Sequence, residues 1–284
     1  MRKFKISDKV ARKMLGMEAA SGETKPEEAP ETAPGAPVNE NTAGLRATSR
    51  TDVGLVRKNN QDTVILAEGL MGVADGMGGH NGGETASTGA RDGLLRLLAG
   101  KTPDRDTLEE AVKQVNLELW ERQEKEESLS GMGTTLSLLW PDREKMLIAH
   151  VGDSRIYLLR EGRLRQVTRD HSIVADMVRR GLLTEEQAAV HPMRNYITRA
   201  VGTETEIQVD ILELERQPGD RWLICSDGLH GLLDREELQK LMSGANLEEA
   251  ADQMMRDALD RGGLDNISLV LISDEAPSEG EVAE

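Results

Sequence analysis

The feature that most constrains the fold is the order of the apolar patterns along the chain. Two helical patterns follow one another at residues 84–99 and 106–125. Runs typical of strands then succeed each other without a helix between them, at 134–140, 146–151, 155–159 and 164–167. A doubly wound parallel sheet needs a helix after almost every strand. The grouping therefore predicts an α+β fold, in which antiparallel sheets carry helices on their outer faces.

The remaining patterns are shorter and are bounded by Gly, Asp or Pro. Further strand-like runs lie at 63–67, 71–74, 207–214, 221–225 and 267–272, and further helical patterns at 172–180, 234–241 and 247–261. The pair Glu161-Gly162, placed between two strand-like runs, predicts a hairpin turn. Asp104 or Asp106 is suited to cap the helix that follows it.

Composition divides the chain into a folded unit and its extensions. Residues 1–20 carry six basic and two acidic side chains, and residues 21–44 hold four of the nine prolines with no apolar periodicity. The last ten residues, 275–284, hold four glutamates and no base. We expect a catalytic domain over 45–274, a disordered linker over 21–44 and a disordered acidic tail. The basic N-terminus either forms a short amphipathic helix, which would touch a partner or an anionic membrane, or stays disordered.

Charge and composition exclude several classes of protein. The net charge of −16 argues against a nucleic-acid partner, because phosphate backbones attract basic surfaces. The single cysteine, Cys225, cannot form a disulfide within the chain, and this favours a cytoplasmic location. No apolar stretch approaches the roughly 18 residues of a membrane span. We expect a monomer with no membrane-spanning segment.

Aspartates fall at the ends of the strand-like runs. Asp75, Asp153 and Asp227 follow such runs, and Asp62 and Asp265 precede them. Several carboxylates at one rim of a sheet would repel each other unless bases or a cation neutralise them. Oxygen-rich clusters of this kind suit Mg²⁺ or Mn²⁺. A single Asp-Gly pair would be explained by a turn alone, but this many acids after and before strands indicate a metal site.

These residues belong to a larger ordered set of motifs. The set reads RKNNQD (57–62), ADGMGGH (74–80), GMGTT (131–135), HVGDSR (150–155), SDGL (226–229) and DNIS (265–268). In this order it resembles the bacterial branch of the metal-dependent Ser/Thr protein phosphatases, the PPM family of protein phosphatase 2C type. The resemblance covers 45–274. It implies a four-layer α-β-β-α sandwich, with two antiparallel sheets flanked by helix pairs and a helical flap at about 171–200 beside the active site.

The resemblance also implies a metal centre of two core ions, Mn²⁺ or Mg²⁺, and a third, weaker one. Asp75 resembles the carboxylate that bridges the two core ions, and Gly76 the residue that lends a backbone carbonyl. Asp227 and Asp265 resemble further ligands of the first ion. Asp62 resembles the acid that holds the second ion through water.

Three further residues take roles from the same resemblance. Asp153 resembles the acid that holds the third ion together with Asp227. Arg57 resembles the arginine that grips the substrate phosphate, since its planar fork matches two phosphate oxygens. Relatives outside the bacterial branch carry a histidine near the first Asp-Gly as a proposed general acid. Here Met77 takes that place, and His80 is either that acid or a solvated loop residue.

The implied activity is hydrolysis of phosphoserine and phosphothreonine in proteins, by in-line attack of a metal-bridged water without a phosphoenzyme intermediate. Phosphoproteins made by a Ser/Thr kinase are the expected partners. The phosphatase loop built on a nucleophilic cysteine is absent, because Gly231 stands where its arginine would follow Cys225.

Three other functions compete with this one. A nucleotide-binding loop would need a lysine after its glycines, and none lies between Lys58 and Lys101. A phosphatase-like module without activity would be expected to lack metal ligands, and Asp75, Asp227 and Asp265 are all present. A phosphoesterase acting on small molecules stays open, because the metals and an arginine recognise phosphate and not the rest of the substrate.

Overall fold

The structure is a computed structural model that describes residues 44–67, 69–79 and 82–275. The chain divides into the units Met1–Thr32 and Ala33–Glu284, and every described residue belongs to the second. The N-terminal segment 1–20, nearly all of the linker 21–44, His80 and the tail beyond residue 275 lie outside the described residues. The expectations for these segments therefore stay predictions.

The first sheet has five strands in the order β1, β11, β10, β7, β8, and all neighbours are antiparallel. The strands are β1 (Leu45–Asp52), β7 (Arg155–Arg160), β8 (Arg163–Gln166), β10 (Arg221–Cys225) and β11 (Ile267–Asp274). Arg160 pairs with Arg163 across the turn between β7 and β8, which confirms the predicted hairpin at Glu161-Gly162.

The second sheet has the order β2, β3, β5, β6, β9, with β4 paired to β3 beside this path. Its strands are β2 (Asp62–Ala67), β3 (Leu70–Met77), β4 (Gly133–Thr134), β5 (Leu136–Pro141), β6 (Lys145–Val151) and β9 (Asp210–Glu215). All its pairs are antiparallel as well. The single strand predicted at 134–140 is thus two strands, which are separated at Thr135.

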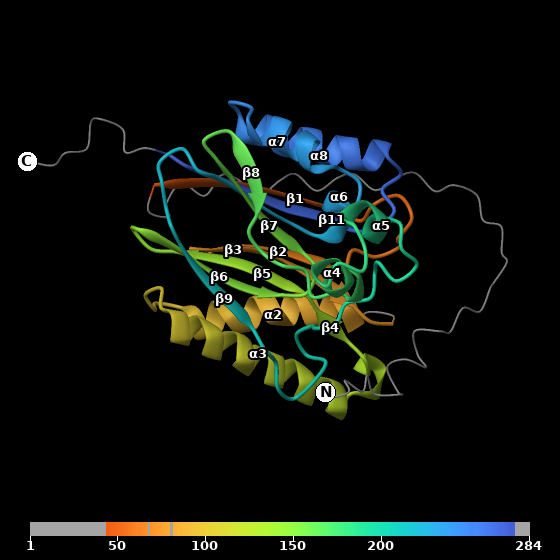
Figure 1. Ribbon diagram of the computed structural model, residues 1–284. Helices are drawn as coiled ribbons and strands as arrows, with labels where there is room; N and C mark the ends of the chain where they lie inside the picture. The colour runs from red at the N-terminus through yellow and green to blue at the C-terminus, as the bar shows by residue number, and fades with distance from the viewer. Residues whose placement is uncertain (1–43, 68, 80–81, 276–284) are drawn as a thin grey trace, which may run out of the picture. The chain divides into compact units, whose positions relative to one another are not determined.

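Helix pairs cover the outer faces of both sheets, which confirms the predicted four-layer sandwich (Figure 1). On the second sheet lie α2 (Gly82–Leu98) and α3 (Arg105–Lys125), and on the first lie α7 (Arg235–Met242) and α8 (Leu247–Asp260). Asp104 caps α3, since its carboxylate accepts from the Thr107 amide at 2.9 Å. The segment expected to form the flap contains α4 (Ile173–Arg179) and α5 (Glu185–Ala189). The sequence did not predict α5, the one-turn α6 (Asp227–His230) or the 3₁₀ turn η1 (Glu127–Leu129).

Buried apolar side chains form three separate layers of core. One lies between the second sheet and α2–α3, one between the first sheet and α7–α8, and the third between the two sheets. Strand β11 shows how one strand serves two layers: Leu269 and Leu271 face the helices, while Val270 and Ile272 face the other sheet. Because successive side chains point to opposite faces, a strand covered on both sides reads as an uninterrupted apolar run.

Strand β1 is an element that the apolar pattern did not reveal. Only its inward side chains are apolar, with Leu45 and Ala47 in the layer between the sheets. On its outer face Arg50 pairs with Glu248 and Asp252 of α8, at 2.6 Å in each case. The edge strand is thus attached to the helix by charged groups, so its sequence lacks the apolar run expected of a buried strand.

Candidate metal centre

The five candidate aspartates lie at strand ends of both sheets. Asp62 and Asp75 are direct partners across the β2–β3 ladder. Asp153 follows β6, Asp227 follows β10 and Asp265 precedes β11. The Ser226 hydroxyl donates to Asp62 Oδ2 at 2.8 Å, and this bond joins the end of β10 in one sheet to the start of β2 in the other. The antiparallel topology therefore brings together acids that are far apart in sequence.

The pKa values of these carboxyl groups show how strongly the acids interact. Burial, followed by the charges of Asp62, Asp227, Asp153 and Asp265, raises the pKa of Asp75 well above its usual value. Burial also raises the pKa of Asp62 to about 7 and that of Asp153 to about 8. For Asp227, burial and the charge of Asp265 raise the pKa to about 6. The cluster is therefore poised to exchange protons for a cation.

Two carboxylate oxygens of the cluster are buried without a hydrogen-bond partner, namely Oδ1 of Asp62 and Oδ1 of Asp227. Buried charged oxygens are costly unless paired or bound to a metal, so the donor set fits a hard divalent cation. Among the described residues, however, no group of three or more His, Cys, Asp or Glu side chains is arranged to hold an ion as it stands. Asp265 in particular is engaged by Arg57, whose Nη2 lies 2.6 Å from its Oδ2.

The bases near the acids in sequence do not neutralise the whole cluster. Arg155, which follows Asp153 closely, forms its ion pair with Asp170 at 2.7 Å. Arg57 forms its one ion pair within the described part of the chain with Asp265, and its side chain remains 53% exposed. The arginine predicted to grip phosphate thus lies at the edge of the acidic cluster and reaches solvent.

The glycine after Asp75 is required by packing. A Cβ at Gly76 would lie 2.1 Å from the carbonyl oxygen of Gly83, at the start of α2, and one at Gly83 would lie 2.6 Å from the carbonyl oxygen of Gly76. Strand β3 and the first turn of α2 therefore touch through backbone alone. This contact fixes the Asp75-Gly76 segment against the helix, and the role of the Gly76 carbonyl as a metal ligand stays a prediction.

The motif GMGTT acts as a clamp on Asp75, a role that the sequence did not reveal. The Thr135 amide donates to the Asp75 carbonyl at 2.8 Å, and the Thr135 hydroxyl accepts from the Asp75 amide at 2.9 Å. The Thr134 hydroxyl donates to the same carbonyl at 2.9 Å. Thr135 Oγ1 also lies 2.7 Å from the hydroxyl of Ser154, next to Asp153. One buried threonine thus connects the segments that carry two of the aspartates.

Asn266 holds the loop that carries Arg57, through bonds from its side chain to backbone groups of that loop. Its side-chain oxygen accepts from the Gln61 amide at 2.8 Å, and its NH₂ group donates to the carbonyls of Val53 and Asn59 at 2.9 and 3.0 Å. The residue is 6% exposed. The Asp-Asn pair therefore combines a candidate metal ligand with a residue that holds the loop carrying Arg57.

Two histidines hold the segment after β6. His230 of α6 donates from Nε2 to the Asp153 carbonyl at 3.0 Å, and burial lowers its pKa to about 3, so it is neutral. His171, at the start of the flap, accepts from the Gly152 amide at 3.0 Å, while its own amide donates to the Gly152 carbonyl at 2.8 Å. The base of the flap is thus attached directly beside Asp153.

Two other sequence features are placed by the structure. Cys225 is buried and the pKa of its thiol is raised to about 12 by burial, which excludes it as a nucleophile. His80 lies outside the described residues. Within the described residues, no helix is both long and apolar enough to cross a membrane.

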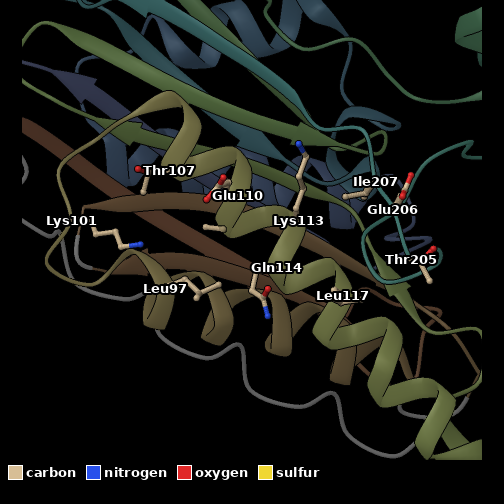
Figure 2. A pocket seen from close by; sticks show the side chains of 11 residues that line it. Leu97, Lys101, Thr107, Glu110, Lys113, Gln114, Leu117, Thr205, Glu206 and Ile207 are labelled. Atoms are coloured by element: carbon tan, nitrogen blue, oxygen red, sulfur yellow. The ribbon is translucent and has the colours of Figure 1, made fainter.

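A cavity of about 850 Å³ lies away from the aspartates, between α2, α3 and the loop before β9 (Figure 2). Its lining combines aliphatic side chains with lysines and glutamates: Leu97, Lys101, Thr107, Glu110, Ala111, Lys113, Gln114, Leu117, Thr205, Glu206 and Ile207. It contains none of the candidate site residues. This cavity is therefore separate from the candidate metal centre.

Comparison with known proteins identifies the family of this chain. The family model for protein phosphatase 2C matches residues 48–267, and the chain belongs to that family. Serine/threonine protein phosphatase PstP of Mycobacterium tuberculosis (strain CDC 1551 / Oshkosh) is 39% identical over 233 residues, which cover 81% of this chain and 45% of PstP. Serine/threonine phosphatase stp of Listeria monocytogenes serotype 4b (strain F2365) is 36% identical over 255 residues, which cover 84% of this chain and 100% of that protein.

A solved structure extends the likeness to three dimensions. The crystal structure of the catalytic domain of PstP in complex with 2 manganese ions matches with a TM-score of 0.75 and 36% identity, covering 81% of this chain and 97% of that one. The chain thus spans less than half the length of full PstP, and nearly all of its catalytic domain.

Proposed function

We propose that this chain is a metal-dependent phosphoprotein phosphatase that hydrolyses phosphoserine and phosphothreonine. The observation that carries the proposal is the gathering of four other aspartates, Asp62, Asp153, Asp227 and Asp265, around the buried Asp75, next to an exposed arginine. Membership of the protein phosphatase 2C family and the names of the relatives support the same activity.

The metal ligands in this proposal are those that the sequence indicated. Asp75, Asp227 and Asp265 would supply carboxylates and Gly76 a carbonyl to the core ions, and Asp62 would help to hold the second ion. Asp153 and Asp227 would hold a third, weaker ion. The two unpaired buried oxygens, on Asp62 and Asp227, fit this use. Mn²⁺ is the first ion to test, because the related PstP catalytic domain is described with 2 manganese ions, and Mg²⁺ is the second.

Bound divalent cations supply an activated water and offset the negative charge on phosphate oxygens. The chain itself contributes orientation and charge. Asn266 and Thr135 fix the backbone on either side of the site, so that the acids do not have to be ordered when substrate arrives. Arg57 exchanges its carboxylate partner, Asp265, for the oxygens of the phosphate, and its exposed guanidinium is accessible to a phosphorylated side chain.

The substrates in this proposal are phosphoproteins made by a Ser/Thr kinase, and the enzyme acts as a cytoplasmic monomer. His80 is the candidate for protonating the leaving oxygen. A phosphoesterase specific for small molecules would use the same metals and the same arginine, so the substrate test has to include both kinds of phosphate ester.

The test is hydrolysis of matched phosphothreonine, phosphoserine and phosphotyrosine peptides, and of p-nitrophenyl phosphate, with Mn²⁺ or Mg²⁺. We expect turnover of the first two peptides that chelator abolishes and added metal restores. Asp75→Asn, which keeps the shape of the side chain, should abolish turnover in a protein with an unchanged circular dichroism spectrum. Hydrolysis of p-nitrophenyl phosphate with no peptide turnover would favour a small-molecule enzyme. No turnover of any ester with metal bound would favour a binding module.

A further inference from the structure

Three large apolar side chains are exposed beside the candidate phosphate site. Leu55, Val56 and Leu264 are 66%, 62% and 60% exposed, and we call them the apolar shelf. Single exposed apolar residues are normal on a protein surface. These three lie on two loops that touch each other, since the Leu55 amide donates to the Gly263 carbonyl at 2.8 Å.

The shelf is held rigidly although it faces solvent. Asn266 holds the first loop through the carbonyls of Val53 and Asn59. Gly54 adopts a φ of +76°, and a Cβ there would lie 2.2 Å from the carbonyl oxygen of Asp265. A Cβ at Gly263 would lie 3.1 Å from Cγ of Leu55, so the two loops are closely packed. Their apolar side chains therefore stay on the outside as a consequence of a fixed backbone.

The shelf residues adjoin, along the chain, the ion pair that contains the proposed phosphate-binding arginine. Val56 directly precedes Arg57, and Leu264 directly precedes Asp265, and these two successors form the ion pair at 2.6 Å. An extended peptide advances about 3.3 Å per residue. If the phosphate of a substrate lies on Arg57, side chains one to three positions away in the peptide reach the surface on which the shelf lies.

We propose that the apolar shelf binds a large aliphatic side chain, such as leucine, close to the phosphorylated residue of an extended phosphopeptide. The inference rests on the proposed phosphatase function and adds a preference among its substrates. Binding removes apolar surface from water on both sides of the contact, which favours substrates that carry such a residue. The shelf does not contribute to the binding of a small phosphate ester, which has no neighbouring side chain to place on it.

The test measures kcat/KM for a set of phosphothreonine peptides in a serine background, with leucine placed in turn at each position from three before to three after the phosphothreonine. We expect the best leucine peptide to exceed the all-serine peptide by about fivefold to tenfold, the effect of partly burying one leucine. In Leu55→Ser and Leu264→Ser this ratio should fall below about twofold. Because the ratio is taken within each variant, a general loss of activity cancels.

Leu117→Ser is the matched control, since Leu117 is partly exposed on α3, beside the cavity that contains none of the candidate site residues. This variant should keep the wild-type ratio. A wild-type ratio near one at every position, a preference that survives both shelf substitutions, or a preference lost equally in the control would each overturn the proposal. Two other occupants of the shelf would also overturn the proposal if the peptide ratio did not change in the shelf variants. One is a second copy of the chain, which a dimer dissociated by Leu264→Ser would show. The other is the segment 1–43, which would be shown if its removal stimulated turnover only in a protein with an intact shelf. Failure to hydrolyse any phosphopeptide would instead refute the proposed function.

Discussion

Replacing Thr135 by valine tests whether the GMGTT clamp positions the metal centre. Valine keeps the branched shape but removes the hydroxyl, which accepts from the Asp75 amide at 2.9 Å and lies 2.7 Å from the Ser154 hydroxyl. Thr135 is 2% exposed, so water cannot easily replace the lost partner. The substitution therefore disturbs the segments that carry Asp75 and Asp153 without creating a large cavity.

The magnitude follows from the groups left unpaired. A buried polar group without a partner costs about 1–3 kcal/mol. With an amide and a hydroxyl affected, we expect the free energy of unfolding to fall by about 2–4 kcal/mol for Thr135→Val in chelator. Residues that orient metal ligands typically contribute about 10–100-fold to metal affinity or activity, and we expect at least about a tenfold loss of Mn²⁺ affinity.

The assay combines urea unfolding in chelator with calorimetric titration of Mn²⁺. Thr205→Val serves as the control, because Thr205 is exposed on the loop before β9 and should change stability by less than about 0.5 kcal/mol. A Thr135→Val protein that loses stability but binds Mn²⁺ as wild type does would refute the reasoning, since the clamp would then stabilise the fold without positioning the acids.

Three further outcomes are expected. Arg57→Ala should raise KM for p-nitrophenyl phosphate, because it removes the group proposed to bind phosphate. It should not weaken Mn²⁺ binding, because it frees Asp265 from its ion pair. An effect on kcat alone would show that the arginine acts in the transition state. The raised pKa values of Asp62 and Asp153, about 7 and 8, mean that the metal-free folded protein keeps protons that the unfolded chain has lost. Its free energy of unfolding should therefore fall by about 2–3 kcal/mol from pH 6.5 to 8 in chelator and not in excess Mn²⁺, and a rise in chelator would contradict these shifts. Deleting residues 1–44 should leave turnover of p-nitrophenyl phosphate intact, and a truncated chain that fails to fold would refute the linker prediction.

The fold was predictable because most strands and helices of its layers produce a recognisable apolar pattern in the sequence. Strands covered on both sides, such as β11, read as apolar runs, and adjacent helices on one sheet produced the block from 84 to 125. Strand β1 was missed because its outer side chains are charged and pair with α8. The short α6 was missed because a helix of four residues is too short to show an apolar periodicity.

The acids of the candidate site were predictable from their positions at strand ends, and the residues that hold them were not. Thr135 and Asn266 act through bonds to backbone groups of other segments, and a single sequence does not show which backbone groups lie near a side chain. The Arg57–Asp265 pair joins residues 208 positions apart, so it too depends on the fold. The position of Asn266 directly after Asp265 was the one sequence signal for these residues, and Thr135 has no acid beside it in the sequence.

The most direct test of the central claim is anomalous diffraction at the manganese edge from crystals of this protein grown or soaked with Mn²⁺. We expect two strong peaks that share Asp75 as a ligand, one of them also bound by Asp227 and Asp265. Manganese bound elsewhere, or an acidic cluster that stays without metal at saturating Mn²⁺, would refute the proposed metal centre.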